Sequence, residues 1–129
     1  MNFKLKQEHK LIQKTARDFA KNELLPKVLY RDENKIWPKD AIKKMADLGF
    51  LGIMVDPKYN GSGMDTLSYT IAMEEIAKVD AAASVVMSVN NSLVCSLLSK
   101  FGNEEQKEKY LKRLAKGELL GAFSLSEPQ

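Results

Sequence analysis

Few side chains in this sequence carry the functional groups that catalysis or metal binding requires. His9 is the single histidine and Cys95 the single cysteine of the 129 residues, which excludes a multi-histidine metal cluster and a cysteine-based zinc site. His9 lies between Glu8 and Lys10 without an obvious nucleophile or metal partner in the sequence, so we expect it at the surface. Cys95 lies in an apolar stretch without a neighbouring positive charge, which predicts a buried, unreactive thiol. The sequence predicts no metal site.

Two further groups of residues have side chains or glycines found in active sites, but their spacing in the sequence does not fit such a site. Glu74 and Glu75 would be an acid–base pair, but adjacent residues of a helix do not face each other, so we expect a solvated or bundle-edge pair. Gly61 and Gly63 stand between an apolar run and a helix, as in a phosphate-binding loop. A third glycine and a Gly-Lys-Ser/Thr triplet are missing, and Asp65 at the helix start would repel phosphate. We therefore expect a flexible turn.

The segment 81–99 carries the pattern that bears most directly on ligand binding. It contains no charged residue, and four of its apolar side chains repeat at spacings that place them on one helix face. They are Ala82, Val86, Val89 and Leu93. Asn90 and Asn91 interrupt this surface, and buried amides must find hydrogen-bond partners. Two interpretations stay open: the amides bond to a neighbouring helix or loop, or this helix lines a pocket for an apolar ligand.

About five helices are needed to position these residues. Apolar spacing predicts them over residues 5–25, 38–48, 65–79, 81–100 and 103–116. Pro26 should kink or break the first helix, because proline lacks an N–H and clashes with the preceding turn. Ile42, Met45 and Leu48 should form the buried stripe of the second helix. The absence of charge in the fourth helix predicts that both of its faces are covered.

The helix ends carry capping residues. Asp65, Asp80 and Asn103 are the expected N-caps of the last three helices, because their side chains can accept a hydrogen bond from the first turn. Gly49 and Gly117 are expected to end the second and fifth helices in the left-handed conformation.

The last residues change character. Leu120, Ala122, Phe123 and Leu125 indicate a strand that begins at residue 119. A single strand without a partner in its chain is not stable. We therefore expect that the sequence was cut from something longer, with a helical domain over 1–118 and the start of a β-domain over 119–129.

Composition narrows the functional classes. The 20 basic and 17 acidic residues give a net charge of +3 with both signs mixed, which does not indicate a nucleic-acid partner. Seven of the 19 residues of segment 81–99 are Ser or Asn, so we expect no membrane span. No apolar run follows Met1, and the single cysteine fits a reducing, cytoplasmic setting.

An ordered set of motifs closely resembles the acyl-CoA dehydrogenase family. The strongest lie in the second half of the chain: Phe101-Gly102-Asn103-Glu104-Glu105-Gln106-Lys107, Leu114-Ala115-Lys116-Gly117-Glu118 and Gly121-Ala122-Phe123-Ser124-Leu125-Ser126-Glu127-Pro128. Weaker matches in the expected order are Arg17-Asp18-Phe19-Ala20, Ala46-Asp47-Leu48-Gly49-Phe50-Leu51-Gly52, Tyr59-Asn60-Gly61-Ser62-Gly63-Met64-Asp65, Glu74-Glu75-Ile76-Ala77 and Asn91-Ser92-Leu93. The resemblance extends over essentially the whole chain.

The resemblance implies an all-α fold, the N-terminal helical bundle of a longer FAD-dependent enzyme, followed by the first strand of its middle β-domain. Such flavoproteins oxidise an acyl-CoA to the trans-2-enoyl-CoA in fatty acid metabolism. They usually pass electrons to an electron-transferring flavoprotein, and a homo-oligomer is expected for the full length. The bulky residues of the fourth helix favour a short or branched acyl group, as in a butyryl-CoA dehydrogenase.

The resemblance also assigns residues. Phe123, Leu125 and Ser126 match strand positions beside the flavin ring. The face that lines the acyl chain matches Val86, Val89, Asn90 and Leu93. No residue of the chain matches the catalytic carboxylate, so we expect the isolated chain to be inactive. The alternative is a free-standing helical module for protein interaction or apolar-ligand binding.

Overall fold

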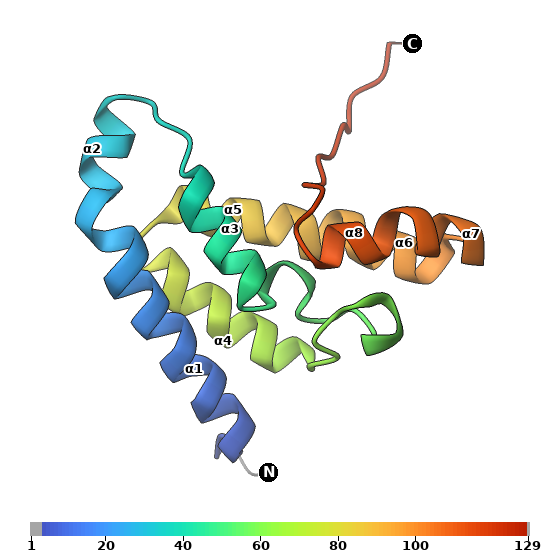
Figure 1. The fold of residues 1–129 in the computed structure, drawn as a ribbon, viewed down its shortest axis with the longest axis horizontal. Coiled ribbons are helices and arrows are strands. Elements are labelled where there is room, and N and C mark those ends of the chain that lie inside the picture. The colour runs from blue at the N-terminus through green and yellow to red at the C-terminus, as the bar shows by residue number, and fades with distance from the viewer. Residues whose placement is uncertain (1–3, 129) are drawn as a thin grey trace.

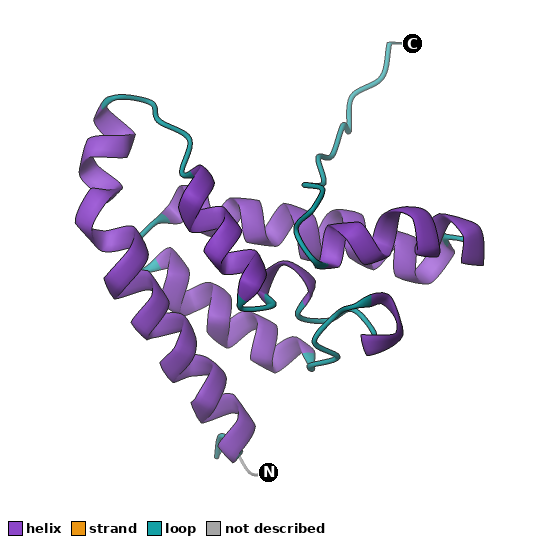
Figure 2. Ribbon diagram, in the orientation of Figure 1, coloured by secondary structure: helices purple, strands orange, loops and turns teal. Residues whose placement is uncertain are grey.

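Helices form all of the regular structure of residues 4–128, which the computed structural model describes (Figure 2). Many helical segments follow one another without a break, so within these residues they join into five helical rods, as expected (Figure 1). The first rod joins α1 (Gln7–Phe19), η1 (Ala20–Leu24), η2 (Leu25–Lys27) and α2 (Val28–Glu33). The second and third rods are α3 (Lys39–Asp47) and α4 (Thr66–Ala77).

The fourth rod, called the long helix below, spans residues 81–101. It joins α5 (Ala81–Ser88), the wide π turns of η5 (Val89–Cys95) and α6 (Ser96–Phe101). The fifth rod joins α7 (Glu104–Gln106), η6 (Lys107–Leu111) and α8 (Lys112–Ala115). Two tight 3-10 turns, η3 (Phe50–Gly52) and η4 (Pro57–Tyr59), lie in the connection between α3 and α4.

The ends of the rods follow the local sequence. Asp65, Asp80 and Asn103 each accept a hydrogen bond from the backbone N–H three residues further along, which confirms the three expected N-caps. Gly49 and Gly117 adopt positive φ angles of 77° and 69°, and each follows the last turn of a helix. Pro26 lies in the tight turn η2, where the first rod changes from a wide turn to α2.

The main core lies where the first four rods meet. Its buried side chains come from α1, η1, α3, η3, α4 and α5, and α1 packs along α4 (Figure 1). Phe50 is fully buried and meets the Phe19 ring edge-on, with 6.0 Å between the ring centroids. A second buried cluster joins the long helix to the fifth rod: Val55, Tyr59, Cys95, Leu111, Leu114 and Ala115.

Two expectations about the buried faces of the helices are wrong. Ile42 and Met45 are buried, but Leu48 is 44% exposed, because α3 has ended there and the chain turns at Gly49. The long helix is not covered on both faces either, since Val85, Leu93 and Leu97 on one of its apolar sides are 58%, 40% and 50% exposed. By length and composition alone, residues 81–101 would suffice to cross a membrane, and 33% of their most apolar window is buried inside the protein.

The C-terminal segment, residues 119–128, is not a strand in this structure. It leaves the bundle as an extended loop that runs away from the helices (Figure 1). A strand needs a neighbour to complete its ladder of hydrogen bonds, and the described residues 4–128 contain no other strand.

The core arrangement predicts a large difference between two neighbouring apolar residues. Phe50→Ala should lower the free energy of unfolding by about 3–5 kcal/mol, because it empties a fully buried ring site. Leu48→Ala, two residues earlier, should cost less than about 1 kcal/mol because its side chain is already half in water. Urea unfolding followed by circular dichroism measures both, and equal losses would contradict this core.

Candidate functional site

Asn91 fixes the turn that follows the second rod. Its Oδ1 accepts a hydrogen bond from the Ile53 N–H at 3.0 Å, and its Nδ2 donates to the Phe50 carbonyl at 2.8 Å and to the Met87 carbonyl at 2.9 Å. The side chain is buried, and all three bonds are made to backbone. One amide therefore pairs two backbone groups of the turn, at Phe50 and Ile53, and one of its own helix, at Met87.

Asn90 connects three segments that are distant in sequence. Its Nδ2 donates to the carbonyls of Leu51 at 2.8 Å and Leu114 at 3.1 Å, and its Oδ1 accepts from the Gly121 N–H at 2.8 Å. The side chain is fully buried. Of the two interpretations that the sequence left open for the amides, the structure fits bonding to neighbouring backbone, and in this chain Asn90 presents no free polar group to a ligand.

The wide turns of η5 let these adjacent amides serve different partners. Hydrogen bonds within η5 follow the π pattern, which widens the helix and re-aims its side chains. Both Asn90 and Asn91 are buried, although neighbours on a regular helix point about 100° apart. The same turns carry Val89 and Leu93 on the opposite, outward side.

An apolar stripe runs along the uncovered side of the long helix. It consists of residues four apart: Val85, Val89, Leu93 and Leu97. Val85 is 58%, Leu93 40% and Leu97 50% exposed, whereas Val89 is half-buried and Val86 packs against the main core. The sequence pattern predicted Val86, Val89 and Leu93 but not Val85 and Leu97. The four-residue repeat was the signal that could have found them.

The C-terminal segment begins beside this helix and then leaves it. A Cβ on Gly121 would lie 2.7 Å from the Cβ of Val94, so only glycine fits against the helix there. Beyond it, residues 122–128 form no hydrogen bond with the described chain. Phe123, Leu125 and Ser126 are all exposed. The structure thus brings the start of the segment to the long helix and leaves its three selected residues uncovered.

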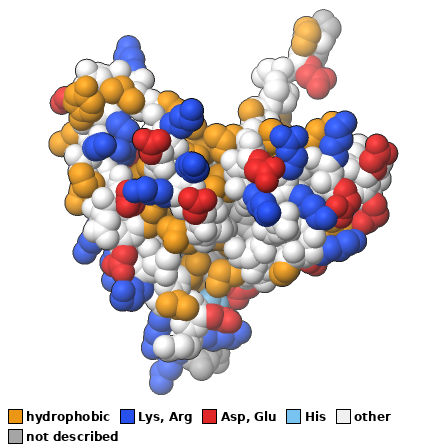
Figure 3. Space-filling model, viewed as in Figure 1, with side chains coloured by type: hydrophobic (Ala, Val, Ile, Leu, Met, Phe, Trp, Pro, Cys, Tyr) orange, Lys and Arg blue, Asp and Glu red, His pale blue; other side chains and the backbone are white. Residues whose placement is uncertain are grey.

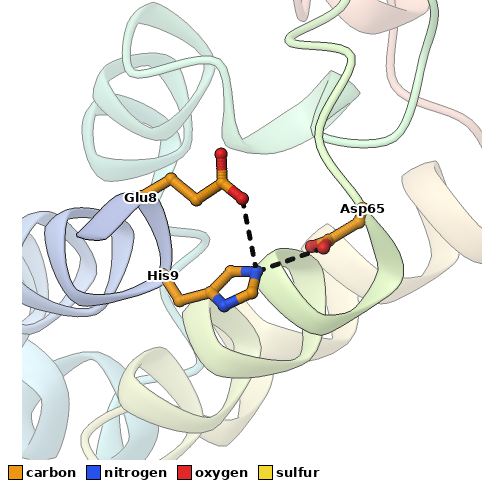
Figure 4. Close-up of side chains that lie close together, drawn as sticks. All are labelled: Glu8, His9 and Asp65. Atoms are coloured by element: carbon orange, nitrogen blue, oxygen red, sulfur yellow. Dashed lines mark hydrogen bonds and ion pairs between the residues drawn. The ribbon is translucent and has the colours of Figure 1, made fainter. Parts of the chain in front are cut away.

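His9 is not at the surface, contrary to expectation. It is 3% exposed, its Nε2 lies 3.1 Å from Asp65 Oδ2, and Glu8 Oε1 lies 3.9 Å away (Figure 4). Its Nδ1 accepts from the Lys6 N–H at 3.4 Å, which places the ring proton on Nε2 as the donor to Asp65. Both ring nitrogens are therefore occupied, and the cluster joins the starts of α1 and α4 instead of presenting a free metal ligand.

Of the two states expected for the Glu74–Glu75 pair, Glu75 fits the bundle edge and is not solvated. Its buried carboxylate receives two hydrogen bonds of 2.9 Å from Arg17 and one of 3.1 Å from Lys78, whereas Glu74 is exposed. The Arg17 guanidinium holds the pKa of Glu75 at about 2, although burial acts to raise it. This pair ties α1 to α4 and contains no group poised to exchange a proton near neutral pH.

The remaining candidates have the roles expected of them. Burial raises the pKa of the Cys95 thiol to about 12, so it is an unreactive core residue. Gly61 packs against backbone, since a Cβ there would lie 2.0 Å from the Val55 carbonyl oxygen, and Gly63 has a φ of +61°. These contacts explain both glycines of the turn by packing and backbone conformation. Basic and acidic side chains are interspersed over the face seen in Figure 3.

Comparison with known proteins gives this arrangement its context. Residues 6–118 match the family described as "Acyl-CoA dehydrogenase, N-terminal domain". The chain belongs to the acyl-CoA dehydrogenase family. Its all-α bundle, expected from apolar spacing and from motif resemblance, is the N-terminal helical domain of that family's fold.

Individual acyl-CoA dehydrogenases are similar over nearly the whole chain. The short-chain specific acyl-CoA dehydrogenase of Clostridium acetobutylicum is 44% identical over 99% of this chain and 34% of its own length. Butyryl-CoA dehydrogenase from Megasphaera elsdenii has a TM-score of 0.93 at 41% identity, covering 99% of this chain and 34% of that one. An acyl-CoA dehydrogenase from Bacillus anthracis, solved in complex with FAD, has a TM-score of 0.88 at 35% identity, covering 96% and 21%. The chain thus spans about a third of the length of the first two and about a fifth of the third.

The Arg17–Glu75 contact of this acyl-CoA dehydrogenase domain predicts acid-sensitive stability. Because the folded-state pKa is lowered to about 2, the carboxylate stabilises the fold fully above its unfolded pKa of about 4.3 and progressively less as the pH falls towards 2. Glu75→Gln should cost about 1.5–3 kcal/mol at neutral pH and little near pH 2. Urea unfolding over this pH range measures the change, with the exposed Glu74→Gln as control. An equal cost at both ends would contradict the contact.

Proposed function

We propose that this chain forms the N-terminal domain of a flavin-dependent acyl-CoA dehydrogenase, in which it supplies one wall of the acyl site and one edge of the flavin site. The observation that carries the proposal is the pairing of an uncovered apolar stripe with an uncovered C-terminal segment in a domain of this family. Residues 1–118 are the helical domain, and residues 119–129 begin the next one. Exposed apolar surface of this kind marks a place where another molecule or domain packs.

The apolar stripe is the proposed wall of the acyl site. Val89 and Leu93 present aliphatic side chains without charge, which suits a hydrocarbon chain. Val86 supports them from beneath, between the stripe and the core. Asn90 supports the same wall from inside the domain through its three backbone contacts. A short or branched acyl group is the proposed substrate, and the name of the Clostridium acetobutylicum relative supports a short one.

The C-terminal segment is the proposed edge of the flavin site. Phe123 and Leu125 offer exposed apolar surface, and Ser126 offers a hydroxyl. The free N–H groups of residues 122–127 and the free C=O groups of residues 122–128 suit the polar edge of a planar ring. This donor set fits FAD, which the Bacillus anthracis structure contains. When bound, FAD supplies the redox chemistry by accepting hydride.

We propose that this domain positions the acyl group and the flavin and takes no part in proton transfer. Its residues at the two sites are aliphatic, aromatic, amide or hydroxyl groups, none of which is a base of suitable pKa for removing an α-proton. The wall and the edge would hold the acyl group near the flavin and exclude water from both. The base would come from another part of the enzyme, so this chain alone should give no turnover above that of free FAD.

Partners follow from the same proposal. Acyl-CoA is the substrate, an electron-transferring flavoprotein accepts the electrons, and the complete enzyme is a homo-oligomer without nucleic-acid partner or membrane span. The long helix then owes its low polarity to the acyl site and to packing against other domains. A reducing, cytoplasmic compartment suits the single buried thiol.

A chimeric enzyme tests the proposal. In it, this chain replaces the matching third of the Clostridium acetobutylicum acyl-CoA dehydrogenase. We expect the chimera to retain FAD and to oxidise a short acyl-CoA. Leu93→Asp should raise its KM for that substrate at least about tenfold, because a charge on the stripe must lose its water when the acyl chain binds.

Leu11→Asp is the matched control, since Leu11 is an exposed leucine on α1 away from the stripe. It should leave the KM unchanged. A chimera that folds without retaining FAD would contradict the flavin edge. A chimera that retains FAD but shows the same KM with Leu93→Asp would contradict the acyl wall.

A further inference from the structure

We propose that Asn90 is a positioning residue that sets the distance and register between the acyl wall and the flavin edge. This inference rests on the proposed function, because it concerns the two surfaces assigned there. Asn90 touches neither ligand itself: it acts through the backbone of the C-terminal segment, at one end, and through the long helix that carries it, at the other.

Beyond Leu119, whose N–H donates to the Arg113 carbonyl at 3.3 Å, the C-terminal segment has a single polar attachment to the domain. Among residues 120–128, all of which the structure describes, the bond from the Gly121 N–H to Asn90 Oδ1 is the one hydrogen bond. Gly121 is two residues from Phe123, and its close approach to Val94 leaves no room for a side chain. The direction in which the segment leaves the bundle therefore depends on this contact.

The Asn90 side chain is not free to move when the segment moves. Its Nδ2 donates to the carbonyls of Leu51 and Leu114, so rotation of the amide would break both bonds inside a fully buried site. The neighbouring residue Val89 belongs to the apolar stripe, and Leu93 follows on the same wide turns. Because the amide is fixed, the position of Gly121 is fixed relative to the apolar stripe.

Asn91 provides a matched control from the same turns. It is equally buried and also makes three hydrogen bonds to backbone, but its partners are Phe50, Ile53 and Met87. None of them belongs to the C-terminal segment. An effect that arises from loss of any buried amide should appear in both alanine variants, whereas loss of the attachment should appear only with Asn90.

NMR of the isotope-labelled 129-residue chain tests the attachment directly. In the unaltered protein we expect a scalar coupling across the hydrogen bond between the Gly121 nitrogen and the Asn90 side-chain carbonyl, and contacts between Gly121 and the Val94 methyl groups. Asn90→Ala should speed hydrogen exchange of the Gly121 amide roughly tenfold, to the level of Ala122. Asn91→Ala should leave Gly121 protected and expose Ile53 instead.

Each outcome of this experiment supports or contradicts the inference, and neither flavin nor substrate is needed. Equal acceleration at Gly121 in both variants, or unchanged exchange in Asn90→Ala, would overturn it. If a variant does not fold, the coupling and the Gly121–Val94 contacts of the unaltered protein still decide, and their absence would overturn the attachment. Because FAD and acyl-CoA are absent from this experiment, its failure is distinct from failure of the proposed function, which the chimera tests.

Discussion

Two adjacent buried amides fix the positions of several segments of this domain relative to the long helix. Asn90 and Asn91 together make hydrogen bonds to the turn at residues 50–53, to the end of the fifth rod and to the C-terminal segment. Each unpaired partner would cost about 1–3 kcal/mol in the interior. The wide turns of η5 make this possible, because they bring both amides inward from neighbouring positions.

That constraint explains how one helix serves two surfaces. The inward side of the long helix is occupied by amides that bind backbone, and by Ala83, Met87 and Cys95 in the core. Its outward side carries aliphatic residues that the described chain covers only in part. The amides give the helix a fixed orientation, and that orientation decides which residues form the apolar stripe.

The sequence predicted features that depend on neighbours along the chain. Asp65, Asp80 and Asn103 cap their helices because a cap needs only the next three residues, and Gly49 and Gly117 end helices for an equally local reason. The family followed from motifs that lie in order over the whole length. The inertness of Cys95 followed from its apolar surroundings in the sequence.

Features that depend on contacts between distant parts of the chain could not be predicted from the sequence. The burial of His9 requires Asp65, 56 residues away, and that of Glu75 requires Arg17, 58 residues away. The partners of Asn90 lie up to 39 residues distant, so the sequence could establish the need for partners but not their identity. The strand expected at residue 119 depends on a neighbour that the described chain does not contain.

Hydrogen exchange at the Ile53 N–H tests most directly whether the side chains of Asn90 and Asn91 hold the segments of the domain together. This N–H lies outside the helices, and its hydrogen bond goes to the Asn91 side chain. Native-state hydrogen exchange measures the free energy of the opening that exposes it. If the amides hold the domain together, Ile53 exchanges only with global unfolding, at the same free energy as the most protected amides of α1 and α4. Exchange as fast as that of an exposed turn would contradict the account.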